Sequence, residues 1–249
     1  MDSLQDATRL PDEFDGRVRL FPLPELVVFP HAMQPLHIFE PRYCEMLNEA
    51  LAGDQLIAMA TIDPAATAGG GVVGIKPAVD PTICIGRIVS HSELEDDRHN
   101  VLLVGIRRAR IRSELDLGRS FRMADVDVNE DIYPPASAKS RPVLKGKLLE
   151  AFGRVIPPTQ EVQKNLYDLM AGQMTLGPIT DIISYMLPFD SRVKLDLLAI
   201  ANVDKRASKL IEVLDRGDVA IESMSVQTEV SKRKDSDGDR QFPPPFSVN

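Results

Sequence analysis

The sequence of 249 residues contains no tryptophan, only two cysteines and no run of 18 apolar residues. The two cysteines, Cys44 and Cys84, are too few for the disulfide framework of a small secreted domain, and neither belongs to a CxxC pair. The short apolar runs lack the length of a membrane-spanning helix, and the acidic residues 1–16 do not resemble a signal peptide. We therefore expect a cytoplasmic protein with no membrane partner, in which both thiols are buried.

The motifs of several common enzyme classes are also absent. The chain has no GxxxxGK(S/T) phosphate loop, no GxSxG nucleophile elbow and no HExxH pair of zinc ligands. These absences argue against ATP hydrolysis and against the commonest forms of nucleophilic or zinc-dependent hydrolysis. We expect no catalytic residue, no metal ligand and no cofactor.

Positive charge is scarce, since 29 lysine and arginine residues face 37 aspartate and glutamate residues, which gives a net charge of −8. A nucleic-acid partner would therefore need a local basic patch. The one notable basic run, Arg107–Arg112, alternates arginine with apolar residues, is diluted by nearby acids and contains no aromatic residue for base stacking. We interpret it as the solvated face of a sheet. RNA binding is kept as an alternative that requires this run to face outward as one patch.

Short apolar and β-branched runs separated by proline, glycine and aspartate dominate residues 18–134, which is typical of a strand-rich domain. One helix interrupts the strands, beginning near Pro41 and ending at Gly53, with Tyr43 on its apolar face. The predicted strands lie within residues 18–23, 26–29, 55–62, 82–94, 100–115 and 121–132.

The hydrophobic period changes to 3.6 after Pro134, which predicts a domain boundary and a helical subdomain over residues 135–222. Ser140, Ser191 and Asp204 are the expected caps of three of its helices. The two ends of the chain cannot bury enough apolar surface to order themselves, because one is acidic and the other is charge-mixed and proline-rich. We predict disordered tails over residues 1–17 and 223–249.

Residues 20–43, LFPLPELVVFPHAMQPLHIFEPRY, strongly resemble the opening of the N-terminal domain of the Lon ATP-dependent protease family. The resemblance continues through residues 86–89 (GRIV), 100–111 (NVLLVGIRRARI) and 181–214. It implies an α+β fold, with a PUA-like β-barrel followed by a small α-helical bundle. It also implies recognition of protein substrates rather than their cleavage, because the ATPase and Ser-Lys peptidase domains of Lon lie beyond the matching region.

The strand-to-helix corner is the predicted binding site, and it comprises His37, Phe39, Glu40, Arg42 and Tyr43. These residues would border a groove between the barrel and the helices that binds extended apolar segments of unfolded or tagged polypeptides. The chain would then act as a substrate receptor or adaptor for a protease or chaperone. A purely structural corner, held by polar contacts of Glu40 and Arg42, is the competing interpretation.

A hydrolase of unrecognised type is the second alternative. It rests on a dense titratable cluster between two predicted strands, which offers nitrogen and oxygen ligands for a divalent metal. The position favours a solvated hairpin tip instead, and the hydrolase would require the cluster to converge in a pocket. The cluster consists of His91, Glu93, Glu95, Asp96, Asp97 and His99.

Overall fold

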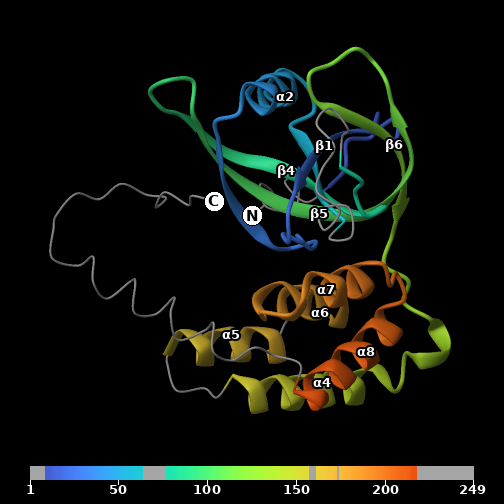
Figure 1. Ribbon diagram of the computed structural model, residues 1–249. Coiled ribbons are helices and arrows are strands. Elements are labelled where there is room, and N and C mark those ends of the chain that lie inside the picture. The colour runs from blue at the N-terminus through green and yellow to red at the C-terminus, as the bar shows by residue number, and fades with distance from the viewer. Residues whose placement is uncertain (1–8, 64–76, 157–160, 173, 218–249) are drawn as a thin grey trace, which may run out of the picture. The chain divides into compact units, whose positions relative to one another are not determined.

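The computed structural model describes residues 9–63, 77–156, 161–172 and 174–217. They form two compact units, of which the first ends at Glu130 and the second begins at Asp131 (Figure 1). The first unit is strand-rich and the second is helical, so the predicted α+β class is confirmed. The predicted tail over residues 223–249 lies outside the described residues.

Six strands of the first unit form one sheet in the order β2-β5-β4-β3-β1-β6, and a further pairing of β5 with β6 closes five of them into a ring. Closure depends on the length of β5, whose first half pairs with β2 while its second half pairs with β6. The strands are β1 (Arg17–Leu23), β2 (Met33–Ile38), β3 (Leu56–Thr61), β4 (Thr82–Glu93), β5 (His99–Leu115) and β6 (Arg122–Asn129).

Alternate residues of the ring strands point to one face and build a single apolar core. Leu10 and Phe14 pack against this core, so the ordered chain begins before the boundary at residue 18 that the sequence predicts. The core consists of Val18, Leu20, Leu56, Ala58, Ala60, Ile83, Ile85, Ile106, Ala109, Ala124 and Val126.

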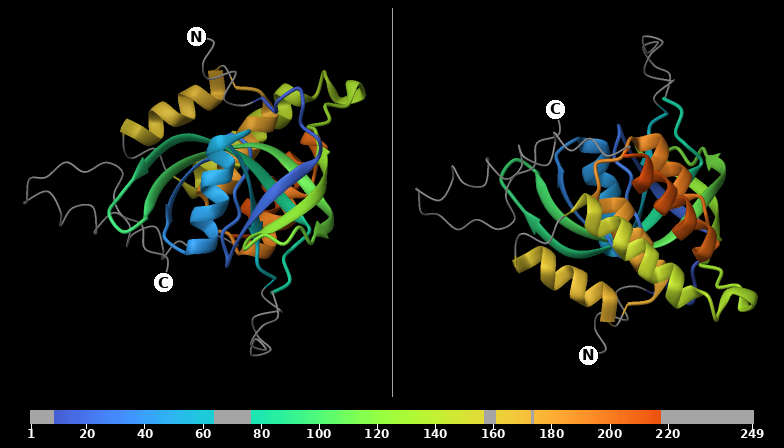
Figure 2. Two further views of the ribbon diagram at one scale, coloured as in Figure 1. Left: turned by 90° about the horizontal axis from the view of Figure 1, so that it is seen from above. Right: turned by 90° about the horizontal axis from the view of Figure 1, so that it is seen from below.

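Helix α2 (Pro41–Ala52) covers one end of the closed sheet and packs on β1 and β3 (Figure 2). Pro41 occupies the first turn, where its missing N–H costs nothing, and Gly53 follows the last turn, as the sequence predicts. Arg19 of β1 donates to Glu49 Oε1 at 3.2 Å and to Asp54 Oδ1 at 2.7 Å. These bonds tie the C-terminal end of the helix to the sheet.

The strand predicted over residues 26–29 is not formed. This segment is a buried irregular loop, bounded by Glu25 at φ 58° and His31 at φ 67°. Val27, Val28 and Phe29 are buried in succession without alternation, and the backbone of His31 donates to Gly105 O at 2.8 Å. The segment pairs with none of the described strands as a β-strand, and β2 pairs with β5.

The described part of the second unit contains five α-helices and one short 3-10 helix. Helix α8 packs against α4 and α6 through their apolar stripes (Figure 1). Two expected caps are displaced, since the helices predicted to start at Ser191 and Asp204 are capped by Asp190 and Asn202. The elements are η1 (Pro135–Ser137), α4 (Arg141–Val155), α5 (Glu161–Gly172), α6 (Leu176–Met186), α7 (Ser191–Leu198) and α8 (Val203–Arg216).

A buried charged cluster lies between helices α6 and α8. Arg206 is fully buried and donates to Thr180 Oγ1 at 2.8 Å, Ile200 O at 2.6 Å and Asp131 Oδ2 at 2.9 Å. Its Nε also lies 3.3 Å from Oδ1 of Asp181, which is fully buried as well. One guanidinium thus joins α8, α6 and the first residue of the second unit.

Replacing Gly146 with alanine is expected to stabilise the second unit by about 0.5–1 kcal/mol, because glycine in a helix interior loses more backbone entropy than alanine. Gly146 is exposed within α4, and a Cβ there would meet no atom within 4 Å. Urea unfolding followed by the helical circular dichroism signal measures the change. Gly177→Ala in α6 is the control with the opposite sign, since its Cβ would collide with Asp131 and Tyr133. A destabilised Gly146→Ala variant would contradict the packing of α4.

None of the helices in the described ranges combines the length and the apolar character that crossing a membrane requires.

Candidate functional site

A pocket of about 390 Å³ opens in the first unit where β1 separates from β6. Strand β1 pairs with β6 only as far as Leu20↔Arg122, whereas it continues beside β3 as far as Leu23↔Thr61. The last residues of β1 therefore have no β6 neighbour on one edge. The pocket lies at this split and is lined by Pro22, Leu23, Pro24, Glu40, Arg42, Tyr43, Ile62, Pro77, Ser120, Phe121 and Arg122.

Two prolines and a tight turn form the β1 wall of the pocket. Pro22 has no N–H, so it lowers the number of unpaired backbone donors at the uncovered edge. After Pro24, the N–H of Leu26 donates to Pro24 O at 2.6 Å across Glu25, whose φ is 58°. Thr61 Oγ1 donates to Leu26 O at 2.9 Å and holds this turn in place. Positive φ at a non-glycine residue costs free energy, and such residues are enriched at functional sites.

Aromatic rings form the apolar base of the pocket. Tyr43 and Phe121 are buried, with 7% and 3% of their surface exposed. The Tyr43 ring meets Phe21 edge to face at 4.6 Å between centroids. Burial raises the pKa of Tyr43 and is the largest effect; the charge of Arg42 opposes it, Glu40 adds a smaller rise, and Arg122 opposes it least. The phenol is therefore neutral at physiological pH.

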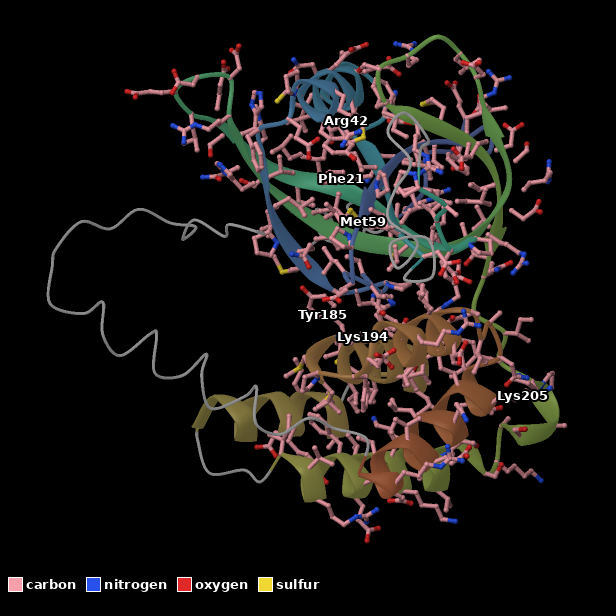
Figure 3. The ribbon with its side chains drawn as sticks, viewed as in Figure 1. Phe21, Arg42, Met59, Tyr185, Lys194 and Lys205 are labelled. Carbon is pink, nitrogen blue, oxygen red and sulfur yellow. The ribbon has the colours of Figure 1, made fainter. Side chains whose placement is uncertain are left out.

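An exposed ion pair forms one side of the rim. Arg42 donates from Nε and Nη2 to Glu40 Oε2 at 3.0 and 2.7 Å, and both side chains are about half exposed. Figure 3 labels Arg42, which lies on α2. Its guanidinium is 4.6 Å from the centroid of the Tyr43 ring, a cation–π distance. The pair thus covers the edge of the aromatic base.

Arg122 forms the opposite side of the rim and is held rigidly. Its side chain is only 10% exposed and forms a two-bond contact with Glu114, with Nε donating at 2.8 Å. Nη1 donates to Pro77 O at 2.7 Å. These three bonds fix the guanidinium beside the pocket without help from a ligand.

Of the five predicted site residues, Glu40, Arg42 and Tyr43 line the pocket, whereas His37 and Phe39 do not. His37 Nδ1 lies 2.9 Å from Asn100 Oδ1 on β5, and its ring is 5.8 Å from Phe39, which is 55% exposed. The polar contact between Glu40 and Arg42 that the structural-corner interpretation expects is present. The corner therefore has both a structural contact and a pocket beside it.

Residues 120–122 are part of the pocket but were not among the predicted site residues. They lie almost 80 positions from the corner, and no motif marks them. Ser120 Oγ donates to Glu45 Oε2 at 2.6 Å, which joins the loop after β5 to α2. Pro22 and Pro24, by contrast, fall within the segment that carries the Lon resemblance.

The arginine run of β5 does not form one outward patch. Arg108 is buried, with 3% of its surface exposed. Arg107 donates to Glu130 at 3.0 Å, and Arg112 pairs with Asp127. The condition set for the RNA-binding alternative is therefore not met by this run.

The titratable cluster lies at the β4–β5 hairpin, as predicted, and brings two histidines together. His91 Nε2 lies 3.0 Å from His99 Nδ1, and burial together with the neighbouring His99 lowers the pKa of His91. Among the residues that the structure describes, no three His, Cys, Asp or Glu side chains converge as a metal site requires. The convergence that the hydrolase alternative needs is thus not observed in these ranges.

A pocket with a buried aromatic base and charged groups at its rim is a candidate ligand site. The chain belongs to the family of the ATP-dependent protease La (LON) substrate-binding domain, whose family model matches residues 17–216. The resemblance drawn from residues 20–43 is therefore confirmed.

Curated relatives include the Lon protease of Heliobacterium modesticaldum, which is 26% identical over 200 residues, or 79% of this chain and 23% of that protein. Lon protease 1 of Syntrophobacter fumaroxidans is 28% identical over 228 residues, which cover 89% of this chain and 26% of that protein. The chain thus spans about a quarter of the length of these relatives.

Two solved structures share the fold. A Lon N-terminal domain protein from Xanthomonas campestris aligns with a TM-score of 0.53 and 19% identity, covering 79% of this chain and 97% of that one. The N-terminal domain of a Mycobacterium avium complex Lon protease aligns with a TM-score of 0.60 and 15% identity, covering 80% and 98%. At these identities the likeness establishes the fold alone.

Proposed function

We propose that this chain is a non-enzymatic polypeptide-binding module that captures extended apolar segments in the pocket between β1, α2 and the start of β6. In this role it acts as a substrate receptor or adaptor in protein quality control and delivers unfolded or tagged polypeptides to a protease or chaperone. The observation that carries the proposal is the position of the pocket, which is built largely from the segment of strongest family resemblance.

The chemistry of the walls favours side-chain capture over strand addition. Pro22 offers no backbone donor at the uncovered edge of β1, so a peptide would gain few main-chain hydrogen bonds there. Pro24 and Phe121 instead offer apolar surface to an inserted side chain. Burying one leucine or phenylalanine side chain contributes about 1.5–3 kcal/mol. We therefore expect weak and reversible capture, as suits a module that releases its clients.

Filling the pocket is expected to weaken capture at least fivefold. Ser120→Trp places a large ring at the exposed mouth, whereas Ser113→Trp alters an exposed serine of β5 that does not line the pocket. Binding of a permanently unfolded protein, reduced and carboxymethylated α-lactalbumin, is measured by fluorescence anisotropy. Because the chain has no tryptophan, the emission of each variant measured without the client reports on the introduced ring alone. Equal binding by the two variants, with the ring at 120 buried, would refute the pocket assignment.

A further inference from the structure

Arg42 and Arg122, which line the pocket, each have N–H groups that donate to no acceptor among the residues that the structure describes. A guanidinium carries five N–H groups. Arg42 uses two of them on Glu40, and Arg122 uses two on Glu114 and one on Pro77 O. Three donors of Arg42 and two of Arg122 therefore remain for water or a ligand.

Both guanidinium groups line the same pocket. Arg42 lies 4.6 Å from the centroid of the Tyr43 ring, and the charges of Arg42 and Arg122 both oppose the larger effect of burial on the pKa of Tyr43. Glu40 is the one carboxylate among the residues that line the pocket, and its pair with Arg42 is half exposed. Exposed ion pairs contribute little free energy, so Arg42 can exchange Glu40 for another anion at little cost. Arg122 needs no movement, because its own partners already hold it.

We propose that the pocket binds the C-terminal α-carboxylate of a polypeptide, with the terminal apolar side chain against Pro22, Pro24 and Phe121. This inference rests on the proposed function and names the part of the client that is recognised. Arginine matches a carboxylate through two parallel hydrogen bonds, and two arginines line this pocket together with prolines, aromatic rings, Ser120 and Glu40.

The apolar walls favour a chain terminus over an acidic side chain. At a C-terminus the carboxylate and the last side chain are attached to the same Cα, so one residue satisfies both the arginines and the apolar base. An aspartate or glutamate side chain would fill the apolar space with its own charged group, which costs desolvation energy. The volume of about 390 Å³ lies near the lower end of ligand pockets, which suits the end of a chain.

The test compares two N-terminally labelled peptides of Gly and Ser that end in Val-Leu-Phe, one as the free acid and one as the C-terminal amide. The wild-type chain is expected to bind the free acid at least tenfold more tightly. Arg42→Gln should weaken binding of the acid about fivefold, whereas Glu40→Gln should strengthen it, because the substitution removes the competing carboxylate. Both variants should change binding of the amide much less than binding of the acid. Arg112→Gln, at an exposed arginine outside the pocket, is the matched control and should change neither affinity.

Three results would overturn the inference. Equal binding of acid and amide by the wild-type chain, with both weakened by Ser120→Trp, would leave apolar capture standing and remove the carboxylate. An amidated peptide with an internal aspartate that binds as tightly as the free acid would assign the anion to a side chain. If the wild-type chain binds neither unfolded protein nor either peptide, the proposed function itself is refuted. Melting temperatures of the variants confirm that each remains folded.

Discussion

Replacing Arg206 with alanine is expected to destabilise the second unit by about 3–5 kcal/mol, enough to unfold it at moderate temperature. The substitution leaves the fully buried Asp181 beside an empty space and removes the donors to Asp131, Thr180 and Ile200 O. A buried carboxylate without its counter-charge is among the costliest defects that one mutation creates. The cavity left by the arginine stem adds to this cost.

Urea unfolding followed by circular dichroism at the helical minimum measures the loss. Arg192→Ala is the matched control, because Arg192 is an exposed arginine on α7, 72% of whose side chain is accessible and which faces Asp196 one turn later. That pair should contribute less than about 1 kcal/mol. A double variant, Arg206→Met with Asp181→Leu, removes both charges and should recover part of the stability. A loss below about 1 kcal/mol for Arg206→Ala would show that the cluster is solvated and that the packing of α6 on α8 differs from the one described.

The sequence predicts where helices occur better than it predicts which residue caps each of them. The apolar stripes identify the helix that begins at Ser191 and the one near Asp204, but the capping side chains are Asp190 and Asn202. Aspartate and serine are comparable caps, so neighbouring candidates cannot be ranked by residue type. Asp204 is instead bound by Arg141 at 2.7 Å, and this bond lowers the pKa of Asp204. Arg141 lies 63 positions earlier, and local patterning carries no information about that partner.

The buried loop before β2 shows a second limit. Residues 26–29 have the β-branched and aromatic composition of a strand, and their burial agrees with that pattern. Their conformation is set by turns at Glu25 and His31, where non-glycine residues adopt positive φ. Positive φ is uncommon at residues other than glycine, so the composition of this segment does not predict the turns at Glu25 and His31. Tertiary contacts, such as the bond from His31 to Gly105, decide the outcome.

The candidate site could be predicted only in part, because it is assembled from both ends of the first unit's sequence. Glu40, Arg42 and Tyr43 share a short segment that carries the family resemblance, and the sequence predicts them as site residues; they line the pocket, and their role in binding stays a prediction. Phe121 and Arg122 enter the pocket through the closure of the ring, which depends on the register of β6 against β1. Register is fixed by side chains on both strands and is not visible in either strand alone.

Tyr43→Ala is expected to destabilise the first unit by about 3 kcal/mol, because it removes a ring buried between α2 and the sheet and leaves a cavity beside Phe21. Phe39→Ala, at an exposed ring of the same corner, is the matched control and should change stability by less than about 0.5 kcal/mol.

Tyr43→Phe keeps the ring and removes only the hydroxyl. If the Tyr43 ring serves packing and the charged rim of the pocket serves binding, Tyr43→Phe retains most of the stability. Any change in its binding of unfolded protein is then not matched by a change in its melting temperature. Thermal unfolding and anisotropy measured on the same samples separate the two effects. Binding that falls across all three variants only in proportion to the unfolded fraction would show that the corner is purely structural, and the polypeptide-binding role would then have to lie elsewhere on the domain.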